Sequence, residues 1–523
     1  MGNFNFFRLG GNRMKTIFKK AVALLCVLLT LCGVAAMPAT AAYEKDLPII
    51  YLVGAIEVVY DKNGKQVWPV TQGIEDILMD NSAELIAAFS TSLMTSDWSV
   101  YGAALDKAID KYYSAGTTDK KGNAKNGTDI KHSVNPTKKT SNFKLGDYKF
   151  RYDPRLDPWE TVEELDSFVN AVLKATGKKK VNFVGRCMGS CILAAYLCRY
   201  GHSKVETALF YSPAVNGATN CSELFAGKVH IDSDTLNNYA NKYMGGDELD
   251  DLLASVINVT YTLNMLGMGT DVATQIFEQL SVEVFPELLR STYAQMPSYW
   301  AMVSEEYYEE AKNFVFGGKE AEYAELIEKI DFYHENVKLR IGNVLKTYNK
   351  NGLKVNVIAK YNKPMPPYLE SHSIQGDGTV NIGDISFGAI GADMGKTLSV
   401  EYLNAAKKSG TIDYISDDLI VDASTCLFPD YTWFVRDVDH GYNPTCIDAL
   451  MMDIFHTKNQ ANIKTFEKYP QFLVFNQSKN TITPVTGPVA NGSAGNSESP
   501  FAKLINFFLS FFNIIKNFFS ILK

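Results

Sequence analysis

Residues 181–190 read Val-Asn-Phe-Val-Gly-Arg-Cys-Met-Gly-Ser, and this stretch decides the fold. Its apolar residues Val181, Phe183 and Val184 form a short run that is typical of a buried strand. The Gly-Arg-Cys-Met-Gly segment combines two turn-forming glycines with one reactive side chain, Cys187. A helical run begins directly afterwards with the apolar residues Cys191, Ile192, Leu193, Ala194, Ala195 and Leu197. The stretch therefore predicts a strand, a tight turn that carries a thiol, and a helix.

The segments on either side of this turn continue the alternation of strand and helix. A strand is expected within 147–158 and another within 205–211, and residues 159–176 carry apolar side chains at helical spacing. This order predicts a parallel sheet with right-handed crossovers. A Gly-x-nucleophile-x-Gly turn between a strand and a helix is the nucleophile elbow of the α/β-hydrolases, where serine is the usual residue. The predicted fold class is therefore α/β, an α/β-hydrolase fold with a large helical cap insertion.

Partners for a nucleophile at Cys187 are found later in the chain. Asp377 lies between two glycines after a strand expected at 353–361, and His440 follows a strand expected at 431–437, the last that we expect. The chain order of nucleophile, acid and histidine is the order that this fold requires. His372 is the competing histidine, but it precedes Asp377 and would break that order. We therefore expect Cys187, Asp377 and His440 to be the catalytic residues.

An oxyanion hole is expected beside Cys187. Residues 46–53 form an apolar strand followed by Gly54-Ala55-Ile56, and in a hydrolase the turn after this strand supplies one backbone N–H of the oxyanion hole. The second donor is expected to be the N–H of Met188, directly after the nucleophile. Read alone, Gly54 would be an ordinary turn glycine.

The overall charge and the N-terminus bear on localisation. The 523-residue chain has a formal net charge of −7, which argues against a nucleic-acid partner. Residues 14–42 read as a secretory signal, with Lys15, Lys19 and Lys20 before an apolar core and Ala39-Thr40-Ala41 as the cleavage site. A membrane anchor or a lipoprotein attachment through Cys32 are the weaker alternatives. Removal of residues 1–41, which carry five basic and no acidic residues, leaves a net charge near −12.

The sequence divides into six predicted parts. These are the signal peptide 1–41, the N-terminal part of the core 42–213, a helical cap 214–351, the C-terminal part of the core 352–476, a flexible linker 477–500 and a terminal helix 501–523. The residues 107–145 are polar and rich in lysine, and we expect them to form a long surface excursion. A helix at 444–455 is expected to close the fold. Within the cap, the segment 296–302 offers aromatic and thioether groups either to an acyl chain or to packing between cap and core.

The terminal segment 501–523 differs in kind from the rest of the chain. Its polar residues recur every three or four positions and form one narrow stripe, while phenylalanine, leucine and isoleucine fill the other faces. With three lysines and no acid, the segment is typical of an interfacial membrane helix, although docking on a partner would also suit it. We expect a membrane surface as its partner.

The cysteine content leaves disulfide pairing open. Of eight cysteines, Cys26 and Cys32 leave with the predicted signal, and an exported chain could pair some of the other six. Cys191 and Cys198 are expected on the inner face of the helix after the elbow, as small buried apolar residues. No C-x-x-C or H-x-x-x-H spacing indicates a metal site, and we expect no cofactor and no metal.

Four motifs resemble the lecithin:cholesterol acyltransferase and lysosomal phospholipase family of α/β-hydrolases. They are the opening strand with its glycine turn and a hairpin ending in Trp68-Pro69, the segment 151–158 (Arg-Tyr-Asp-Pro-Arg-Leu-Asp-Pro), the elbow, and Gly376-Asp-Gly-Thr-Val380. Pro154 stands where the family has tryptophan, and the cap and the residues 107–145 match weakly. The resemblance implies Cys187 as nucleophile, Asp377 as acid, His440 as base, and Ile56 or Ala55 with Met188 as oxyanion donors. It also implies transfer or hydrolysis of fatty acyl groups from lipids.

The residue at the nucleophile position departs from that family and leaves three interpretations. A thiolate paired with an imidazolium is a strong nucleophile, and the dienelactone hydrolases resemble this chain in having Gly-x-Cys-x-Gly. Alternatively, the cysteine has impaired an ancestral serine esterase, or the chain is a surface module that binds lipid or a partner without chemistry. The presence of Asp377, His440 and both elbow glycines favours a secreted, lipase-like ester hydrolase or acyltransferase that acts through an acyl-enzyme on Cys187.

Overall fold

The structure is a computed structural model, and the residues described are 46–55, 57–71, 77, 80–125, 128–130, 135–137, 140, 142–229, 282, 284–366 and 369–487. The predicted signal peptide and the terminal segment 501–523 lie outside these residues. Among the described residues, no helix combines the length and the apolar character that crossing a bilayer requires.

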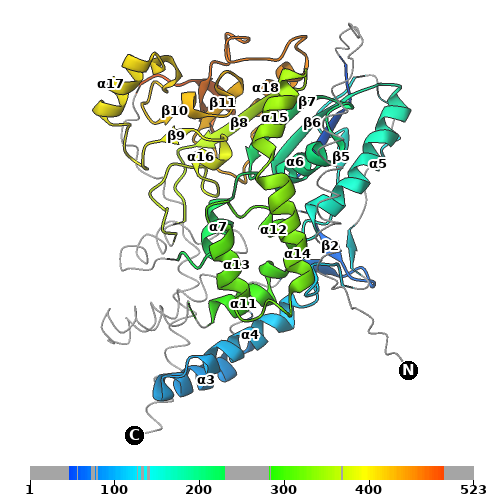
Figure 1. The fold of residues 1–523 in the computed structure, drawn as a ribbon, viewed down its shortest axis with the longest axis vertical. Helices are drawn as coiled ribbons and strands as arrows, with labels where there is room; N and C mark the ends of the chain where they lie inside the picture. The colour runs from blue at the N-terminus through cyan, green and yellow to red at the C-terminus, as the bar shows by residue number, and fades with distance from the viewer. Residues whose placement is uncertain are drawn as a thin grey trace, which may run out of the picture. The chain divides into compact units, whose positions relative to one another are not determined.

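A single large sheet forms the centre of the described chain (Figure 1). Its strand order is β13-β12-β11-β8-β7-β6-β1-β5, and every neighbouring pair is parallel except β12 and β13. The strands are β1 (Ile49–Leu52), β5 (Tyr148–Phe150), β6 (Val181–Cys187), β7 (Val205–Pro213), β8 (Lys354–Tyr361), β11 (Thr432–Arg436), β12 (Phe472–Asn476) and β13 (Thr481–Pro484). The parallel pairing brings the carboxyl ends of β6, β8 and β11 to the same edge of the sheet.

Helices cover both faces of this sheet because its strands are apolar on both sides. Along β6, Phe183 packs in one buried cluster with α6 (Met188–Tyr200), while Val184 packs in a second cluster with α18 (Thr445–Phe455). Successive strand residues point to opposite faces, so one strand serves both layers. The helices α5 (Pro158–Thr176) and α15 (Ile341–Lys350) pack beside α6 (Figure 1). The predicted α/β class, with a mostly parallel sheet flanked by helices, is confirmed.

The two ends of α5 illustrate how the sequence sets these elements. Asp157 caps α5, since its carboxylate accepts a hydrogen bond of 2.8 Å from the N–H of Trp159, and Pro158 occupies the first helical position. Gly177 ends the helix in the left-handed conformation, with φ of 68°. The helix therefore spans Pro158–Thr176, close to the predicted range of 159–176.

The insertion between β7 and β8 contains only helices among its named elements, within the described residues 214–229 and 284–350. They are α7 (Thr219–Phe225), α11 (Phe285–Ser291), η1 (Tyr293–Gln295), α12 (Pro297–Trp300), α13 (Tyr308–Phe316), α14 (Ala324–Tyr333), the π-helical turn η2 (His334–Lys338) and α15. Its last helix, α15, packs on α6 and leads into β8, so it serves as the crossover helix of the sheet.

Four predictions are corrected by the structure. The strand before His440, β11, is not the last strand, because β12 and β13 follow it in the chain. For the same reason, the helix predicted at 444–455, which is α18, does not close the fold. The residues 481–484 belong to β13, so the flexible linker does not begin at 477, and its residues 488–500 lie outside the described part of the chain. The residues 107–113 form the end of α4 (Ser99–Tyr113) rather than a surface loop.

The remaining elements lie outside the large sheet. A small sheet joins β2 (Val59–Tyr60), β3 (Gln66–Trp68) and β4 (Asp129–Ile130), and its β2–β3 hairpin is the one predicted to end in Trp68-Pro69. Helix α3 (Ser82–Thr95) precedes α4, which packs against α11. Between β8 and β11 lie α16 (Ile382–Ile385), β9 (Ile390–Gly391), α17 (Val400–Ser409), η3 (Ile412–Tyr414), β10 (Val421–Asp422), η4 (Ala423–Thr425) and η5 (Pro429–Tyr431).

Candidate active site

Cys187 ends β6 at the sharp turn into α6. Its backbone has φ of 50° and ψ of −128°, a combination that residues other than glycine rarely adopt. Such a conformation costs about 1–3 kcal/mol and persists where the surrounding structure enforces it, which is most often at functional sites. The Cys187 side chain is half-buried. The turn therefore has the strained geometry expected of a nucleophile elbow.

The two elbow glycines are required by close approaches of the backbone. A Cβ added at Gly189 would lie 2.3 Å from the carbonyl oxygen of Leu52, and one at Gly185 would lie 2.9 Å from the Cα of Ser190. Both distances are too short for any side chain. Helix α6 can therefore lie this close to β1 and fold back on β6 only with glycine at both positions.

The turn after β1 lies against the nucleophile. A Cβ added at Gly54 would lie 3.1 Å from the Cβ of Cys187 and 3.5 Å from its Sγ. The hydroxyl of Tyr152 donates a hydrogen bond of 2.6 Å to the carbonyl oxygen of Val53 and so holds the start of this turn. Ala55 is half-buried in the same turn, and Ile56 lies outside the described residues.

The second predicted oxyanion donor also lies at the nucleophile. Met188 is the first residue of α6, and its backbone N–H forms a hydrogen bond with the Cys187 sulfur. The N-terminus of a helix concentrates free N–H groups and positive potential, which stabilise a nearby anion. The structure therefore brings Met188 and the Gly54-Ala55 turn together around the thiol.

Asp377 and His440 form a direct hydrogen bond. The Nδ1 of His440 lies 2.6 Å from Oδ2 of Asp377, and the backbone N–H of His440 donates to the carbonyl oxygen of Asp377 at 2.9 Å. The other carboxylate oxygen, Oδ1, accepts from the backbone N–H groups of Thr379 at 3.1 Å and Val380 at 2.9 Å. Both side chains are buried. This bonding fixes the orientation of the imidazole ring.

His440 in turn faces Cys187, and the two side chains shift each other's pKa. Burial raises the pKa of the Cys187 thiol, but the positive charge of His440, its hydrogen bond and the charge of Arg186 outweigh this, and the pKa is lowered overall. Burial lowers the pKa of His440, but Asp377 and Cys187 together raise it to about 10. Nε2 of His440 makes no hydrogen bond of regular geometry with a described residue. These opposite shifts of the two pKa values favour a thiolate–imidazolium pair.

Two cations hold the loop that carries His440. Arg186 donates through Nη2 to the carbonyl oxygens of His440 at 3.1 Å and Gly441 at 2.8 Å. The Nζ of Lys360, which is buried, donates to the carbonyl oxygens of Asp439, His440 and Tyr442 at 3.2, 3.1 and 2.8 Å. Burial lowers the pKa of Lys360 to about 7. These bonds connect Arg186, the residue before Cys187, and strand β8 directly to the loop that carries His440.

Sequence reasoning missed both of these cations. A signal for Lys360 was present, because it is the one charged residue in the continuous buried run Val355–Tyr361. A buried charge must be paired or hydrogen-bonded, so its position inside that run indicated partners at the end of the strand. No comparable signal marked Arg186, whose contact with His440 joins residues far apart in the sequence.

The competing histidine lies elsewhere. His372 is exposed, and its Nδ1 bonds the carbonyl oxygen of Leu369 at 2.8 Å. No bond joins it to Asp377 within the described residues, whereas His440 has two. The geometry thus pairs Asp377 with His440. In the described part of the chain, no group of three or more His, Cys, Asp or Glu side chains is arranged to hold a metal ion.

Comparison with known protein families agrees with this geometry. A family model described as the alpha/beta hydrolase fold matches residues 116–242, a range that includes β5, α5, β6, the elbow, α6 and β7. This protein has the α/β-hydrolase fold. No curated protein matches the chain significantly. The match supports hydrolase activity in general.

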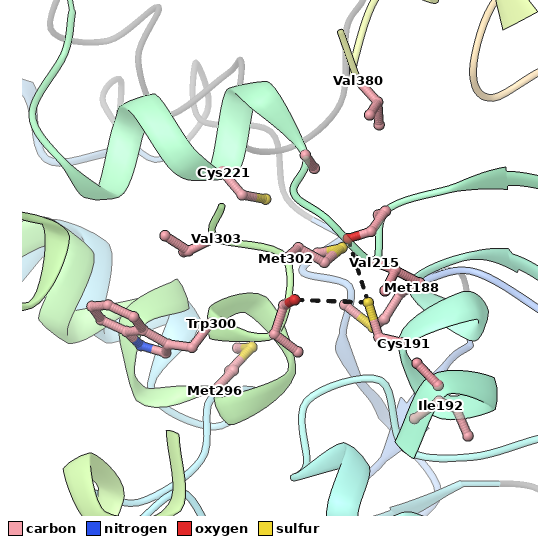
Figure 2. Close-up of a cluster of buried hydrophobic side chains, with 14 of the residues drawn as sticks. Met188, Cys191, Ile192, Val215, Cys221, Met296, Trp300, Met302, Val303 and Val380 are labelled. Carbon is pink, nitrogen blue, oxygen red and sulfur yellow. Dashed lines mark hydrogen bonds between the residues drawn. The ribbon is translucent and has the colours of Figure 1, made fainter. Parts of the chain in front are cut away.

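An apolar layer lies beside the elbow, between α6 and the insertion (Figure 2). Figure 2 shows Met188 and Cys191 of α6, Cys221 of α7, and Met296, Trp300 and Met302 of the insertion as members of one buried cluster. The Sγ of Cys191 bonds the carbonyl oxygens of Ala214 and Ala301 at 3.6 and 3.8 Å (Figure 2). Met296, Trp300 and Met302 are all buried. Of the two interpretations of residues 296–302, the structure favours packing between insertion and core.

The cysteines of the described residues are unpaired. Cys187, Cys191, Cys198, Cys221, Cys426 and Cys446 are all free thiols. Cys191 is buried, as expected for a small apolar residue, but Cys198 is only half-buried. Burial raises the pKa of Cys191 to about 11 and that of Cys198 to about 12. Their environments therefore oppose thiolate formation, in contrast to that of Cys187.

Proposed function

We propose that this α/β-hydrolase is a cysteine-dependent acyl-transfer enzyme that cleaves carboxylic esters through a thioester on Cys187. The single observation that carries the proposal is the connected series Asp377–His440–Cys187 at a strained elbow, in which the thiol pKa is lowered and the imidazole pKa is raised. A pair of titratable groups shifted in opposite directions is typical of an acid and base assignment.

In the first half-reaction, the Cys187 thiolate attacks the ester carbonyl carbon and forms a carbon–sulfur bond. The carbonyl electrons move onto oxygen, and the backbone N–H of Met188, with one from the Gly54-Ala55-Ile56 turn, stabilises the oxyanion. Collapse of this intermediate breaks the carbon–oxygen bond of the ester. His440 gives its proton to the departing alkoxide, while Asp377 holds the ring orientation.

In the second half-reaction, neutral His440 removes a proton from water or from an acceptor alcohol. The resulting nucleophile attacks the thioester carbonyl, the carbon–sulfur bond breaks, and the Cys187 thiolate leaves. The acid or the new ester is released, and protonated His440 again faces a thiolate. After one cycle the enzyme has returned to its starting protonation state.

A lipid ester as the substrate is part of the same proposal. The four motifs shared with the lecithin:cholesterol acyltransferase and lysosomal phospholipase family support it, as does the terminal segment 501–523 with its single polar stripe. The signal-like residues 14–42 support export, and the terminal segment would then hold the enzyme at a membrane surface. The resemblance favours fatty acyl groups on a lipid alcohol.

Pre-steady-state kinetics with p-nitrophenyl butyrate test the proposal. The full chain should release a burst of p-nitrophenol equal to one acyl group per enzyme, and Cys187→Ala and His440→Ala should show none. A lipid-binding or partner-binding protein without chemistry predicts no burst and no preferential labelling of Cys187. Full esterase activity in Cys187→Ala would contradict the assignment of the nucleophile.

A further inference from the structure

A cavity whose lining includes none of Cys187, Asp377 and His440 lies between α7 and the residues around α16. It has a volume of about 770 Å³, which suits a small organic ligand. Its wall is largely polar and comes from α7, the segment before α13, the π-helical turn, and the residues around α16: Asn216, Thr219, Ser222, Glu223, Ser304, Glu305, Glu306, Tyr307, Lys338, Ser371, Ile374, Asn381 and Asp384. Such a wall suits a polar ligand.

The cavity contains a buried ammonium group without a hydrogen-bond partner. Lys338 is 8% exposed, and its Nζ donates to no atom in the described part of the chain. Burial lowers its pKa to about 8, so it remains charged at neutral pH. A buried ammonium that donates no hydrogen bond is costly, because its desolvation is not compensated. A ligand that accepts from Nζ would remove this cost.

A second buried polar atom in the wall is also unpartnered. The Oγ of Ser304, whose side chain is 8% exposed, makes no hydrogen bond with a described residue. Its neighbour Ser222 is satisfied, because it accepts from the N–H of Ser304 at 2.9 Å and donates to the carbonyl oxygen of Ala218 at 3.0 Å. Ser304 Oγ and Lys338 Nζ are thus two buried polar atoms of the cavity wall that have no hydrogen-bond partner among the described residues.

The backbone conformation at Lys338 also marks this position as unusual. Helix α14 continues into the π-helical turn η2, and Lys338 is the last residue of that turn. Single π-helical turns are rare and frequently occur at functional sites, because they redirect one side chain relative to a regular helix. The turn is anchored by His334, whose ring stacks on Tyr308 at a centroid distance of 3.8 Å.

The cavity wall carries charges of both signs. Glu223 and Asp384 contribute carboxyl groups inside, and Glu305 and Glu306 are exposed, so an anion would be repelled. A metal cation has no lone pair that could accept from Nζ of Lys338, so it would leave that ammonium unsatisfied. The two carboxyl groups inside the cavity already accept hydrogen bonds from other wall residues. Asn381 donates through Nδ2 to Asp384 at 2.7 Å, and Ser371 donates to Glu223. A neutral ligand is therefore favoured.

Hydroxyl groups meet these requirements because each one both accepts and donates a hydrogen bond. One hydroxyl can accept from Lys338 and donate to Asp384, and another can bond Ser304. Tyr307 also lines the cavity, and an aromatic ring suits contact with the C–H groups of such a ligand. We propose that this cavity binds a neutral polyhydroxylated ligand, either a free sugar or polyol or the sugar head group of a lipid.

Saturation-transfer NMR on the full chain tests this proposal with D-galactose, myo-inositol and glycerol as probes. At least one probe should bind, and Lys338→Met and Ser304→Ala should each weaken binding about tenfold or more. Lys350→Met, which changes an exposed lysine at the end of α15, is the matched control and should bind as the parent does. Thermal unfolding of each variant verifies that it is folded, and Ser304→Ala removes only one oxygen if Lys338→Met does not fold.

A parallel arm uses vesicles of phosphatidylcholine with and without monogalactosyl diacylglycerol, and compares them with free galactose. Binding to either the free probe or the galactolipid supports the proposal and identifies the source. Absence of binding in both arms, or equal binding by the parent and both folded variants, overturns it. Cys187→Ala should bind as the parent does, since this site does not depend on the proposed ester chemistry.

Discussion

The guanidinium of Arg186 donates a hydrogen bond of 3.1 Å to the backbone carbonyl oxygen of His440. The residue next to the proposed nucleophile therefore holds the loop of the proposed base. Lys360 bonds the same carbonyl oxygen at 3.1 Å from β8. One backbone oxygen thus accepts hydrogen bonds from two side chains, one on β6 and one on β8, and these bonds restrict the position of the His440 loop relative to Cys187.

We expect loss of the hydrogen bonds from Arg186 and Lys360 to lower catalytic activity more than it lowers the free energy of unfolding. In Arg186→Gln and Lys360→Met, His440 keeps its bond to Asp377 but is less restricted relative to Cys187, so kcat/KM with an activated ester should fall about tenfold or more. The pH at which the Cys187 thiol ionises should rise in both variants, which a merely structural role would not produce. Stopped-flow alkylation across a pH series measures this.

Lys363→Met is the matched control for Arg186→Gln and Lys360→Met. Lys363 forms an ion pair of 3.2 Å with Asp439 in the same loop, but the Asp439 side chain is 66% exposed. Exposed ion pairs contribute roughly 0–1 kcal/mol, so both kcat/KM and the thiol pKa should stay close to those of the parent. A fall as large as that of Arg186→Gln would mean that any change in the loop has the same effect.

Selective alkylation of Cys187 at neutral pH is a second expected result. The pKa of Cys187 is lowered by the charge and hydrogen bond of His440, whereas burial raises the pKa of Cys191 to about 11 and of Cys198 and Cys426 to about 12, so Cys187 should ionise at a lower pH than these three thiols. The rate with iodoacetamide should fall as the pH drops below the Cys187 pKa and the thiolate gains a proton. Peptide mass mapping should locate the first label at Cys187.

Removal of the imidazole should shift this profile to higher pH. In His440→Ala the charge and the hydrogen bond that lower the Cys187 pKa are absent, so alkylation at pH 7 should slow and recover only in alkaline buffer. Above about pH 10 the parent loses the imidazolium itself, and ester cleavage should decline although the thiolate persists. Unchanged alkylation in His440→Ala would show that the two side chains do not interact.

Substitution of the nucleophile tests whether the site is adapted to sulfur. In Cys187→Ser the hydroxyl keeps its proton at neutral pH, so the ion pair with His440 is lost, and we expect kcat to fall by about a hundredfold or more. Steady-state rates with the same ester measure the effect. A large gain in rate would instead identify an impaired serine esterase.

The elbow glycines give a prediction about stability. In Gly189→Ala the added Cβ would meet the backbone oxygens of Leu52 and Val53 at 2.3 and 2.6 Å, so the free energy of unfolding should fall by about 3 kcal/mol or more. Gly342→Ala in α15 is the control, because its Cβ would have a nearest neighbour at 3.9 Å, and it should be neutral or stabilise by about 0.5–1 kcal/mol. Urea unfolding measures both, and equal stability of the two variants would contradict the account of the elbow.

Much of the sheet could be predicted because its strands are short apolar runs separated by a periodic helix and glycine turns. The elbow, Asp377 and His440 follow from local residue patterns together with the fixed chain order of the fold. β13 was missed because only Ile482 of its four residues is buried, so its sequence resembles a loop. The end of α4 was missed because its exposed face carries Lys107, Asp110 and Lys111, and the α11 residues that cover its other face lie far away in the sequence.

The contacts that refine the site are tertiary and could not be derived from local patterns. The distance from Arg186 to His440 depends on how β6 and β11 are ordered in the sheet, and the cavity at Lys338 depends on how the insertion packs against the residues around α16. Gly54 illustrates the intermediate case. Its position after β1 was visible in the sequence, but only the structure places its Cα beside the Cβ of Cys187.

The central claim is a covalent thioester at Cys187, and intact-protein mass spectrometry after rapid acid quench tests it most directly. With p-nitrophenyl butyrate the full chain should gain the mass of one butyryl group, a peptide digest should locate it at Cys187, and hydroxylamine should remove it. Cys187→Ala should gain no mass. A chain that turns over the ester without any adduct at Cys187, or an adduct that persists in Cys187→Ala, would contradict the account.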